Sequence, residues 1–424
     1  MSYRFQKFTT IYPVFVRQFL AANPDYEQVP YQELYDRFVN TRYGLANFYA
    51  QHMNSLGNEA QDLFASFEPL QKMWAKENGI KYGEDHWLQD IVLAQVKVFQ
   101  PDALYLQDLY LFDQAFRQQL RQICGKKVII VGWRAAPTPD FSVFRDLDIV
   151  LTCVPNFVRN LQRNGANAAL MPLAFEHTIL DVVEPAENRD LDFTFVGSLG
   201  SANGFWCERN LVVEQLMQFT PLQIWSDIND SPPRFIRDRV LDKVIYRANR
   251  FMDGVGVSKE LRENVPLIRR GTSWMSDPTL PSLKQRYPGR CHESVFGLKN
   301  FEVLARSKIV FNSHGDCAED YAGNIRLYEA TGMGACLLTD WKVNLPDLFE
   351  PDVEVVTYRN SEEGIEKVRY LLDHEDERRS IAVAGQRRTL RDHTFERRVD
   401  QLDEIIQSLL PSRANTRTDY ASSV

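Results

Sequence analysis

Apolar and polar positions follow two alternating spacings along the chain. Short, mostly apolar runs such as 102–107 and 147–153 are separated by longer stretches in which apolar residues recur every three or four positions. The first spacing is typical of strands buried on both faces, and the second is typical of amphipathic helices. Repeated strand–helix–strand units predict an α/β protein with mostly parallel sheets.

This alternation occurs twice, which predicts two α/β domains. Strands are expected at 3–10, 58–67, 102–107, 126–133, 147–153 and 166–174, and again at 191–198, 221–226, 308–314, 335–340 and 353–358. Helices are expected at 12–23, 30–53, 68–79, 84–100, 110–123, 156–165, 298–307, 324–332, 344–349, 361–375, 376–393 and 395–410.

The domain limits follow from the polar segment 178–190, which contains a proline and is interpreted as a linker. We expect an N-terminal domain over 1–180, a C-terminal domain over 181–395, and a last helix with a polar, disordered tail over 396–424. Within 228–290, helical segments are expected around 234–252, and an irregular, basic stretch with prolines follows them. The whole region is interpreted as an insertion or an elaborated strand-to-helix connection.

Composition narrows the functional classes. The 424 residues carry a formal net charge of −8, which argues against nucleic acid as the main partner. No apolar run is long enough to span a membrane, and the first residues lack the apolar region of a signal peptide. The six cysteines form no CxxC pair and indicate a reducing, cytoplasmic location. The seven histidines form no HxxxH or HxH pair, so no metal site is expected.

The segment "NSHGDCAEDYAGNIRLYEATGMGACLLTD" (312–340) carries the most chemistry. The predicted strand 308–314 ends in polar residues, and open α/β sheets bind their ligands at the carboxyl ends of their strands. Asn324 is expected to cap the next helix, whose free N–H groups favour an anion. Arg326 suits a diphosphate and Glu329, three residues later on the same helix face, suits a ribose diol. The alternative is an ordinary Arg–Glu pair on a solvated face.

Two further sets of residues could contact the same ligand. In "FVGSLGSANGFWCER", Gly197 and Ser198 end a predicted strand, and Arg209 lies in the helix after the loop. Such a loop leaves backbone N–H groups free to approach a phosphate. His314 could bond a phosphate or a base, or could equally satisfy a loop carbonyl. Gly332 and Gly334 are best explained as the end of a helix and the entry to a strand.

The segment from about 291 to 400 resembles the C-terminal domain of the CgeB-like (spore maturation protein) glycosyltransferases, relatives of the family 4 group with the GT-B architecture. The matching pieces are "VFGLKNFEVLARSKIVFNSHGD", "AGNIRLYEATGMGACLLTD", "LFEPDVEVVTY" and "IAVAGQRRTLRDHTFERR", with weaker likeness at "FVGSLG" and "MPLAFE". The resemblance implies two Rossmann-like domains facing across a cleft. It also implies a nucleotide-sugar donor bound mainly by the second domain and an acceptor bound mainly by the first.

The same resemblance assigns roles to single residues. The family 4 group carries a Glu-x7-Glu motif whose second Glu contacts the ribose, and Glu329 matches that position. Tyr321 stands at the first position, so this chain departs from the pattern there and the retaining mechanism of the group is not implied. Asn324, Arg326 and Glu329 carry over as donor-binding residues.

An inverting transferase needs a general base facing the acceptor hydroxyl. In the first domain the candidates are Asp108, Asp140 and His86, although each could be an ordinary loop or cap residue. The resemblance to the GT-B architecture implies that a helix N-terminus and arginine stabilise the leaving phosphate, without a metal or other cofactor, and the absence of an Asp-x-Asp motif near a strand end agrees with this.

Three functions are therefore open. The first is transfer of a sugar from a nucleotide sugar to a saccharide, lipid-linked or protein acceptor. The second is epimerisation of a nucleotide sugar on the same architecture, and the third is a non-catalytic nucleotide-sugar-binding or coat-associated protein. Arginines within 375–400 could give peripheral membrane contact, although a solvated, salt-bridged face fits their mixture with acidic residues better.

Overall fold

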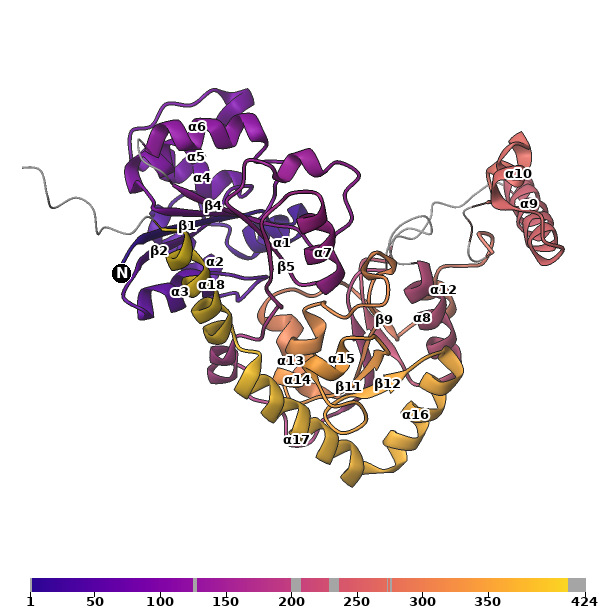
Figure 1. Cartoon of the computed structure of the whole chain (residues 1–424). Helices are drawn as coiled ribbons and strands as arrows, with labels where there is room; N and C mark the ends of the chain where they lie inside the picture. Colours follow the sequence, from indigo (N-terminus) through magenta and orange to yellow (C-terminus); the bar gives the residue numbers. More distant parts are fainter. Residues whose placement is uncertain are drawn as a thin grey trace, which may run out of the picture. The chain divides into compact units, whose positions relative to one another are not determined.

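The computed structural model describes residues 2–124, 128–199, 207–228, 236–272, 274 and 277–410 (Figure 1). The chain divides into unit 1, formed by Met1–His177 and Asp392–Val424, and unit 2, formed by Thr178–Arg391. The polar tail expected to be disordered, 411–424, lies outside the described residues. In the part that is described, no helix is both long enough and apolar enough to cross a membrane.

Unit 1 is built on a parallel six-stranded sheet in the order β2-β1-β3-β4-β5-β6. Its strands are β1 (Arg4–Thr9), β2 (Glu59–Phe64), β3 (Ala103–Leu106), β4 (Ile129–Trp133), β5 (Ile149–Thr152) and β6 (Ala168–Leu170). The six strands predicted in this half are confirmed, but β6 is limited to three residues because the chain pairs with β5 only over that length.

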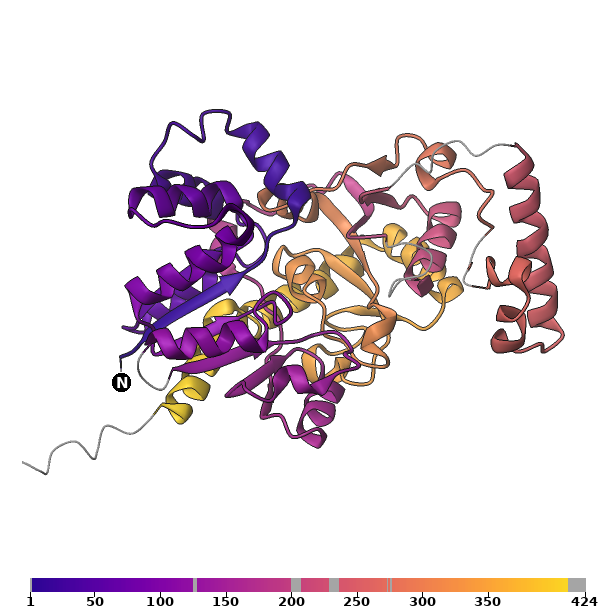
Figure 2. The same ribbon diagram turned by 90° about the horizontal axis from the view of Figure 1, so that it is seen from above.

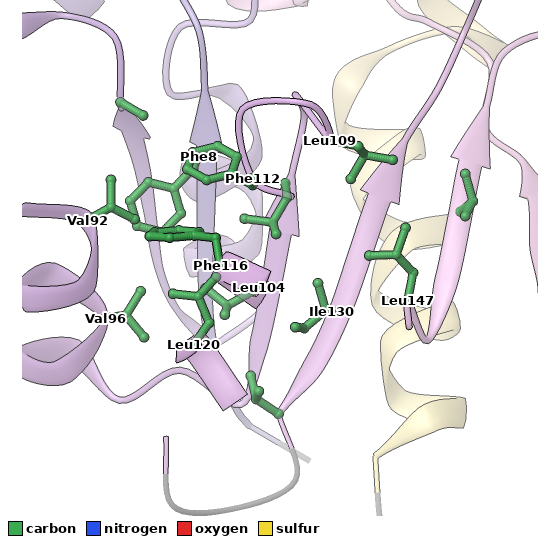
Figure 3. Packing of buried hydrophobic residues seen from close by; sticks show 14 of the residues in the cluster. Phe8, Val92, Val96, Leu104, Leu109, Phe112, Phe116, Leu120, Ile130 and Leu147 are labelled. Carbon is green, nitrogen blue, oxygen red and sulfur yellow. The ribbon is translucent and has the colours of Figure 1, made fainter. Parts of the chain in front are cut away.

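The helices of unit 1 cover this sheet. They are α1 (Pro13–Ala22), α2 (Tyr31–Val39), α3 (Phe48–Ser55), α4 (Glu68–Glu77), α5 (Trp87–Phe99), α6 (Gln114–Cys124), α7 (Pro155–Arg163) and α18 (Phe395–Leu409). Figure 3 shows Phe8 and Leu104 from the strands packed with Val96 of α5 and with Phe116 and Leu120 of α6. Burial of these apolar side chains fixes the helices on the sheet.

The single helix predicted over 30–53 is wrong, because the structure has two helices there, α2 and α3. Between them Arg42, Gly44 and Ala46 have φ values of 55°, 60° and 35°. Residues in the left-handed region cannot continue a right-handed helix. The apolar spacing resumes in α3 after this interruption, which made the pattern look continuous.

Unit 2 contains a second parallel six-stranded sheet, in the order β12-β11-β10-β7-β8-β9. Its strands are β7 (Leu191–Val196), β8 (Gln223–Trp225), β9 (Cys291–His292), β10 (Ser307–Asn312), β11 (Cys336–Asp340) and β12 (Val356–Tyr358). Counted from β7, this is the Rossmann order 3-2-1-4-5-6 seen from the other edge, with the reversal between β7 and β10.

The helices of unit 2 follow the predicted alternation, and within the described part of 228–290 a helix lies where helical segments are expected around 234–252, followed by three short helices that the pattern did not predict. They are α8 (Cys207–Phe219), α9 (Ile236–Gly254), α10 (Lys259–Glu263), α11 (Pro266–Arg269), α12 (Leu283–Arg286), α13 (Leu298–Arg306), α14 (Arg326–Gly332), α15 (Leu345–Leu348), α16 (Ser361–Asp373) and α17 (Glu375–Asp392). Helices α9, α10 and α11 pack on one another, and α10 lies beside α9 in both Figure 1 and Figure 2. Gly334 has φ +67°, which confirms its role between α14 and β11.

Candidate functional site

The polar residues that follow the strands of unit 2 gather where the strand order reverses. Gly197 and Ser198 come directly after β7, Ser313 and His314 follow β10, and Asp340 ends β11. Because β7, β10 and β11 are neighbours and run parallel, these residues share the carboxyl edge of the sheet. Open α/β sheets bind their ligands at such a reversal.

Arg209 joins the ends of the two central strands. It lies in the first turn of α8, and its side chain is buried. Its Nη2 donates to the carbonyl of Ser313, and its Nη1 donates to the carbonyl of Ser198 over 3.3 Å. Burial lowers the pKa of Arg209 to about 10, so its guanidinium stays charged at neutral pH.

His314 and Asp340 form a second buried contact at the same edge. His314 Nδ1 lies 2.7 Å from Asp340 Oδ1, and the backbone N–H of His314 donates to the same carboxylate over 3.1 Å. Burial alone would raise the pKa of Asp340, but the charge and hydrogen bonds of His314, together with Lys342, hold that pKa below its ordinary value. Within the described residues, His314 Nε2 is buried and makes no hydrogen bond.

Arg326 and Glu329 contact each other on α14. Arg326 Nη1 lies 2.9 Å from Glu329 Oε2, and it also donates to Asn300 Oδ1 over 2.9 Å. Both side chains are largely buried, with 15% and 11% of their surface exposed. The pair predicted from the i, i+3 spacing therefore exists, but the face that carries it is not a solvated one. The guanidinium of Arg326 is directed to Glu329 and Asn300.

Asn324 does not cap α14, so that part of the prediction is wrong. The residue before the helix is Ile325, and no side chain caps it. The amide of Asn324 instead pairs with that of Asn312 at the end of β10, with N···O distances of 2.7 Å and 3.2 Å. Two amides can satisfy both a donor and an acceptor of each other, which a cap to one N–H cannot. The side chain thus ties the loop before α14 to the sheet.

The candidate bases of unit 1 lie in loops. Asp108 follows β3 and Asp140 follows β4, so both are near the carboxyl edge of the first sheet. Asp108 Oδ1 accepts the N–H groups of Tyr110 and Leu111, and Asp140 accepts that of Ser142. Hydrogen bonds from Ser142 hold the pKa of Asp140 below its ordinary value. His86 is exposed in the short helix η1 (Glu84–His86). A role as base stays a prediction for all three.

Several of the basic residues between 375 and 400 pair with other groups of the protein, some buried and some exposed. Arg378 donates to the carbonyl of Leu371, Arg388 to that of Leu348, and Arg379 pairs with Glu375 over 2.7 Å. A cavity of about 440 Å³ lies at the amino end of the second sheet, and it is lined in part by Arg189, Lys308 and Gly334. It therefore lies at the opposite edge from His314 and Arg209.

Sequence reasoning did not identify Asp340 or Asn300. Asp340 appeared only as the last residue of a predicted strand, although that position already places it beside the end of β10. Asn300 lies in α13, which reaches Arg326 only through the packing of α13 on α14. No local pattern marks such a residue.

Comparison with known proteins supports this topology. Residues 259–404 match the family model described as "Glycosyl transferase-like". No curated protein matches the chain significantly.

Among solved structures, the chain is similar to a sucrose-phosphate synthase from Thermosynechococcus elongatus, with a TM-score of 0.53 and 9% identity over 96% of this chain and 99% of the other. It is also similar to Alr3699/HepE from Anabaena in complex with UDP-glucose, with a TM-score of 0.54 and 12% identity over 96% and 100% of the two chains. A third is the trehalose 6-phosphate synthase from Burkholderia multivorans, with a TM-score of 0.51 and 10% identity over the whole of both chains. At these identities the likeness establishes the fold, and the predicted GT-B class with two Rossmann-like sheets is confirmed.

Proposed function

We propose that the protein is a glycosyltransferase that moves a sugar from a nucleotide-sugar donor to an acceptor hydroxyl. The observation that carries this proposal is the pair of buried groups, Arg209 and His314, at the reversal point of the Rossmann sheet in unit 2. A buried cation beside a histidine suits an anionic ligand at that edge. The glycosyltransferase-like match over 259–404 and the GT-B fold support the same class of reaction.

Arg209 and His314 would hold the diphosphate of the donor. Arg209 stays charged at neutral pH, and His314 presents an Nε2 that makes no hydrogen bond within the described residues. Asp340 holds Nδ1 and so orients the ring, which leaves Nε2 as the ring nitrogen that would contact a phosphate oxygen when the ligand binds. Charge that develops on the leaving nucleotide is thereby stabilised by side chains, without a metal at this site.

Glu329 would bind the ribose of the nucleotide. A carboxylate can accept hydrogen bonds from both hydroxyls of a diol, and Glu329 Oε2 makes no aligned hydrogen bond within the described residues. In this arrangement Arg326 orients Glu329 together with Asn300 and does not contact the diphosphate itself. Asn324 fixes the loop before α14 through Asn312.

The acceptor would be a saccharide, a lipid-linked compound or a protein. Its hydroxyl would lose a proton to a base from unit 1, for which Asp108, Asp140 and His86 are the candidates. Ser198 would contribute a backbone N–H near the donor, whereas the N–H of Gly197 already donates to the carbonyl of Trp225 over 3.2 Å.

Calorimetry with UDP-, GDP-, dTDP- and ADP-linked sugars tests the donor site. We expect one compound to bind, and Glu329→Ala to weaken its affinity by about 10- to 100-fold through loss of hydrogen bonds to a charged group. The matched control is Glu362→Ala at the exposed start of α16. A panel in which nothing binds, or equal affinity in Glu329→Ala and the wild type, would refute this site.

A second measurement separates transfer from epimerisation. NMR of the protein with the bound donor and no acceptor should show an unchanged sugar, apart from slow hydrolysis. Conversion of the sugar to its epimer in that mixture would contradict the transferase proposal. Donor binding with no transfer to any acceptor of the three classes would instead favour a non-catalytic binding protein.

A further inference from the structure

Unit 1 contains a cluster of two histidines and one glutamate that the proposed reaction does not use. His52 lies in α3, Glu176 lies in the segment after β6, and His177 begins the short helix η3 (His177–Asp181). The ligand atoms of these three side chains all lie within 4.8 Å of one another. His52 and Glu176 are 124 positions apart, so no sequence spacing could have revealed the cluster.

The glutamate of this cluster is fully enclosed. Glu176 is 1% exposed and His52 is 8% exposed. A carboxylate removed from water in this way is costly unless a cation neutralises it. His52 Nε2 lies 2.8 Å from Glu176 Oε2, and His177 Nδ1 lies 3.8 Å from Glu176 Oε1.

His177 supplies an independent observation. Its Nδ1 is a buried atom that makes no hydrogen bond within the described residues. The atom nevertheless points at the carboxylate side of the cluster, and the rings of His52 and His177 have centroids 5.9 Å apart. A hydrogen-bonded pair of His52 and Glu176 alone does not explain why a second imidazole turns a polar atom inward. A shared ligand between the three groups does explain it.

We propose that His52, Glu176 and His177 bind one zinc ion. Two imidazole nitrogens and one carboxylate oxygen are the borderline donors that Zn²⁺ prefers, at about 2.0–2.2 Å from the metal. Ligand atoms around a tetrahedral zinc ion would be about 3.4 Å apart. The ligand atoms of this cluster are separated by distances from 2.8 Å, between His52 Nε2 and Glu176 Oε2, up to at most 4.8 Å, so small shifts would bring them to that spacing. The side chain of His177 is 41% exposed, so a water from that side completes the coordination.

The zinc ion would fasten α3 to the segment in which unit 1 ends along the chain. Because Glu176 and His177 immediately precede Thr178, the first residue of unit 2, the ion would fix the backbone that leaves unit 1. The three ligands belong to unit 1, whereas Arg209, His314 and Glu329 belong to unit 2. None of the three ligands is among the residues proposed above to hold the donor.

Metal uptake by the full chain tests this proposal. The protein is treated with a chelator, dialysed against micromolar zinc, and analysed for metal and by competition with a chromogenic chelator. We expect one zinc per chain and a rise in melting temperature on metal addition. His177→Ala should weaken binding by more than the ~10- to 100-fold that loss of an outer-shell partner costs. His86→Ala, which removes an exposed histidine, is the matched control.

Cobalt substitution provides a readout that does not depend on stability. Co²⁺ in a tetrahedral site with two imidazoles should give strong visible absorption in the wild type and in His86→Ala, and none in His177→Ala. Absence of zinc uptake by the wild type would overturn the proposal, as would equal uptake by His177→Ala. In either case the cluster is a hydrogen-bonded pair of His52 and Glu176 with a neighbouring imidazole. Donor binding is measured on the same proteins, so that a failure of the zinc proposal can be distinguished from a failure of the donor site in unit 2.

Discussion

Unit 1 and unit 2 both bury charged side chains in their sheets, but at different points along the strands. In unit 1, Lys7 of β1 and Asp62 of β2 lie opposite each other in the middle of the paired strands, and both side chains are 0% exposed. In unit 2, Arg209 and the His314–Asp340 pair lie at the carboxyl ends of the strands. A charged side chain buried in the middle of the strands contacts only other groups of the protein, whereas one at a strand end can also contact a ligand.

The environment of each group supports this distinction. Lys7 Nζ lies 3.2 Å from Asp62 Oδ1 and packs over the rings of Tyr49 and Tyr105. Asp62 Oδ2 also accepts the N–H of Ala50 over 2.7 Å. Burial raises the pKa of Asp62 even though Lys7 lies beside it. Removal of this pair from water therefore costs free energy, which the rest of the fold must offset. The pair in unit 1 is therefore structural.

The largest effect is expected for breaking the pair in unit 1. Lys7→Met should lower the free energy of unfolding by about 3–5 kcal/mol, because it leaves Asp62 buried without its cation. The double variant Lys7→Met/Asp62→Asn removes both charges and keeps an acceptor for Ala50, so it should be more stable than Lys7→Met alone. Urea unfolding of the three proteins measures the difference.

The double variant also tests the comparison itself. A purely structural pair predicts that donor affinity in unit 2 is unchanged in Lys7→Met/Asp62→Asn. If the double variant were no more stable than Lys7→Met, the lysine would stabilise unit 1 through its contacts with the two tyrosines and not through its charge.

A smaller effect is expected for the cation at the strand ends of unit 2. Arg209→Lys keeps the charge but loses the planar fork that reaches both Ser198 and Ser313, so it should cost about 2–3 kcal/mol of stability. It should also weaken donor binding by about tenfold or more. The control Arg306→Lys alters an exposed pair with Asp190 and should cost less than about 1 kcal/mol. Calorimetry measures donor affinity and urea unfolding measures stability in both variants. Equal donor affinity and equal stability in Arg209→Lys and Arg306→Lys would show that Arg209 is not part of the site.

The fold was predictable where local patterns decide it. Each strand of unit 1 lies within a predicted run, because the spacing of apolar residues in strands differs from that in helices. The pattern gave no sign of β9, since Cys291 and His292 form a strand only by pairing with β8. The pattern also predicted one helix where the structure has α2 and α3. The break involves left-handed backbone at Arg42 and Ala46, and neither residue is a glycine that would have signalled it.

The candidate site was predictable in part. The positions of His314 at a strand end and of Arg209 at a helix start could be predicted, because such ends have recognisable sequence neighbours. Glu329 was chosen from its spacing to Arg326 and from the family resemblance, and its role stays a prediction. Asp340 and the cluster of His52, Glu176 and His177 could not, since each depends on segments that meet only in the folded chain. The role of Asn324 was wrong for a related reason: its side chain prefers a tertiary partner, Asn312, to the nearby helix N–H groups.

The smallest effect is expected for Asp340, and it depends on pH. Asp340→Asn keeps the shape and an acceptor for His314 but removes the charge, which should cost about 1–2 kcal/mol at pH 7. Because the folded pKa of Asp340 lies below its ordinary value of 3.8, this stability is fully present above that value and is lost as the pH falls through the folded pKa. The stability difference between wild type and Asp340→Asn should therefore be constant from about pH 5 to 7 and should shrink below about pH 4. Urea unfolding across this range measures it, with the exposed Asp347→Asn as control. A difference that does not change with pH would mean that the charge of Asp340 contributes nothing to the strand-end contact, and the contrast drawn here with the charged pair of unit 1 would then not apply to Asp340.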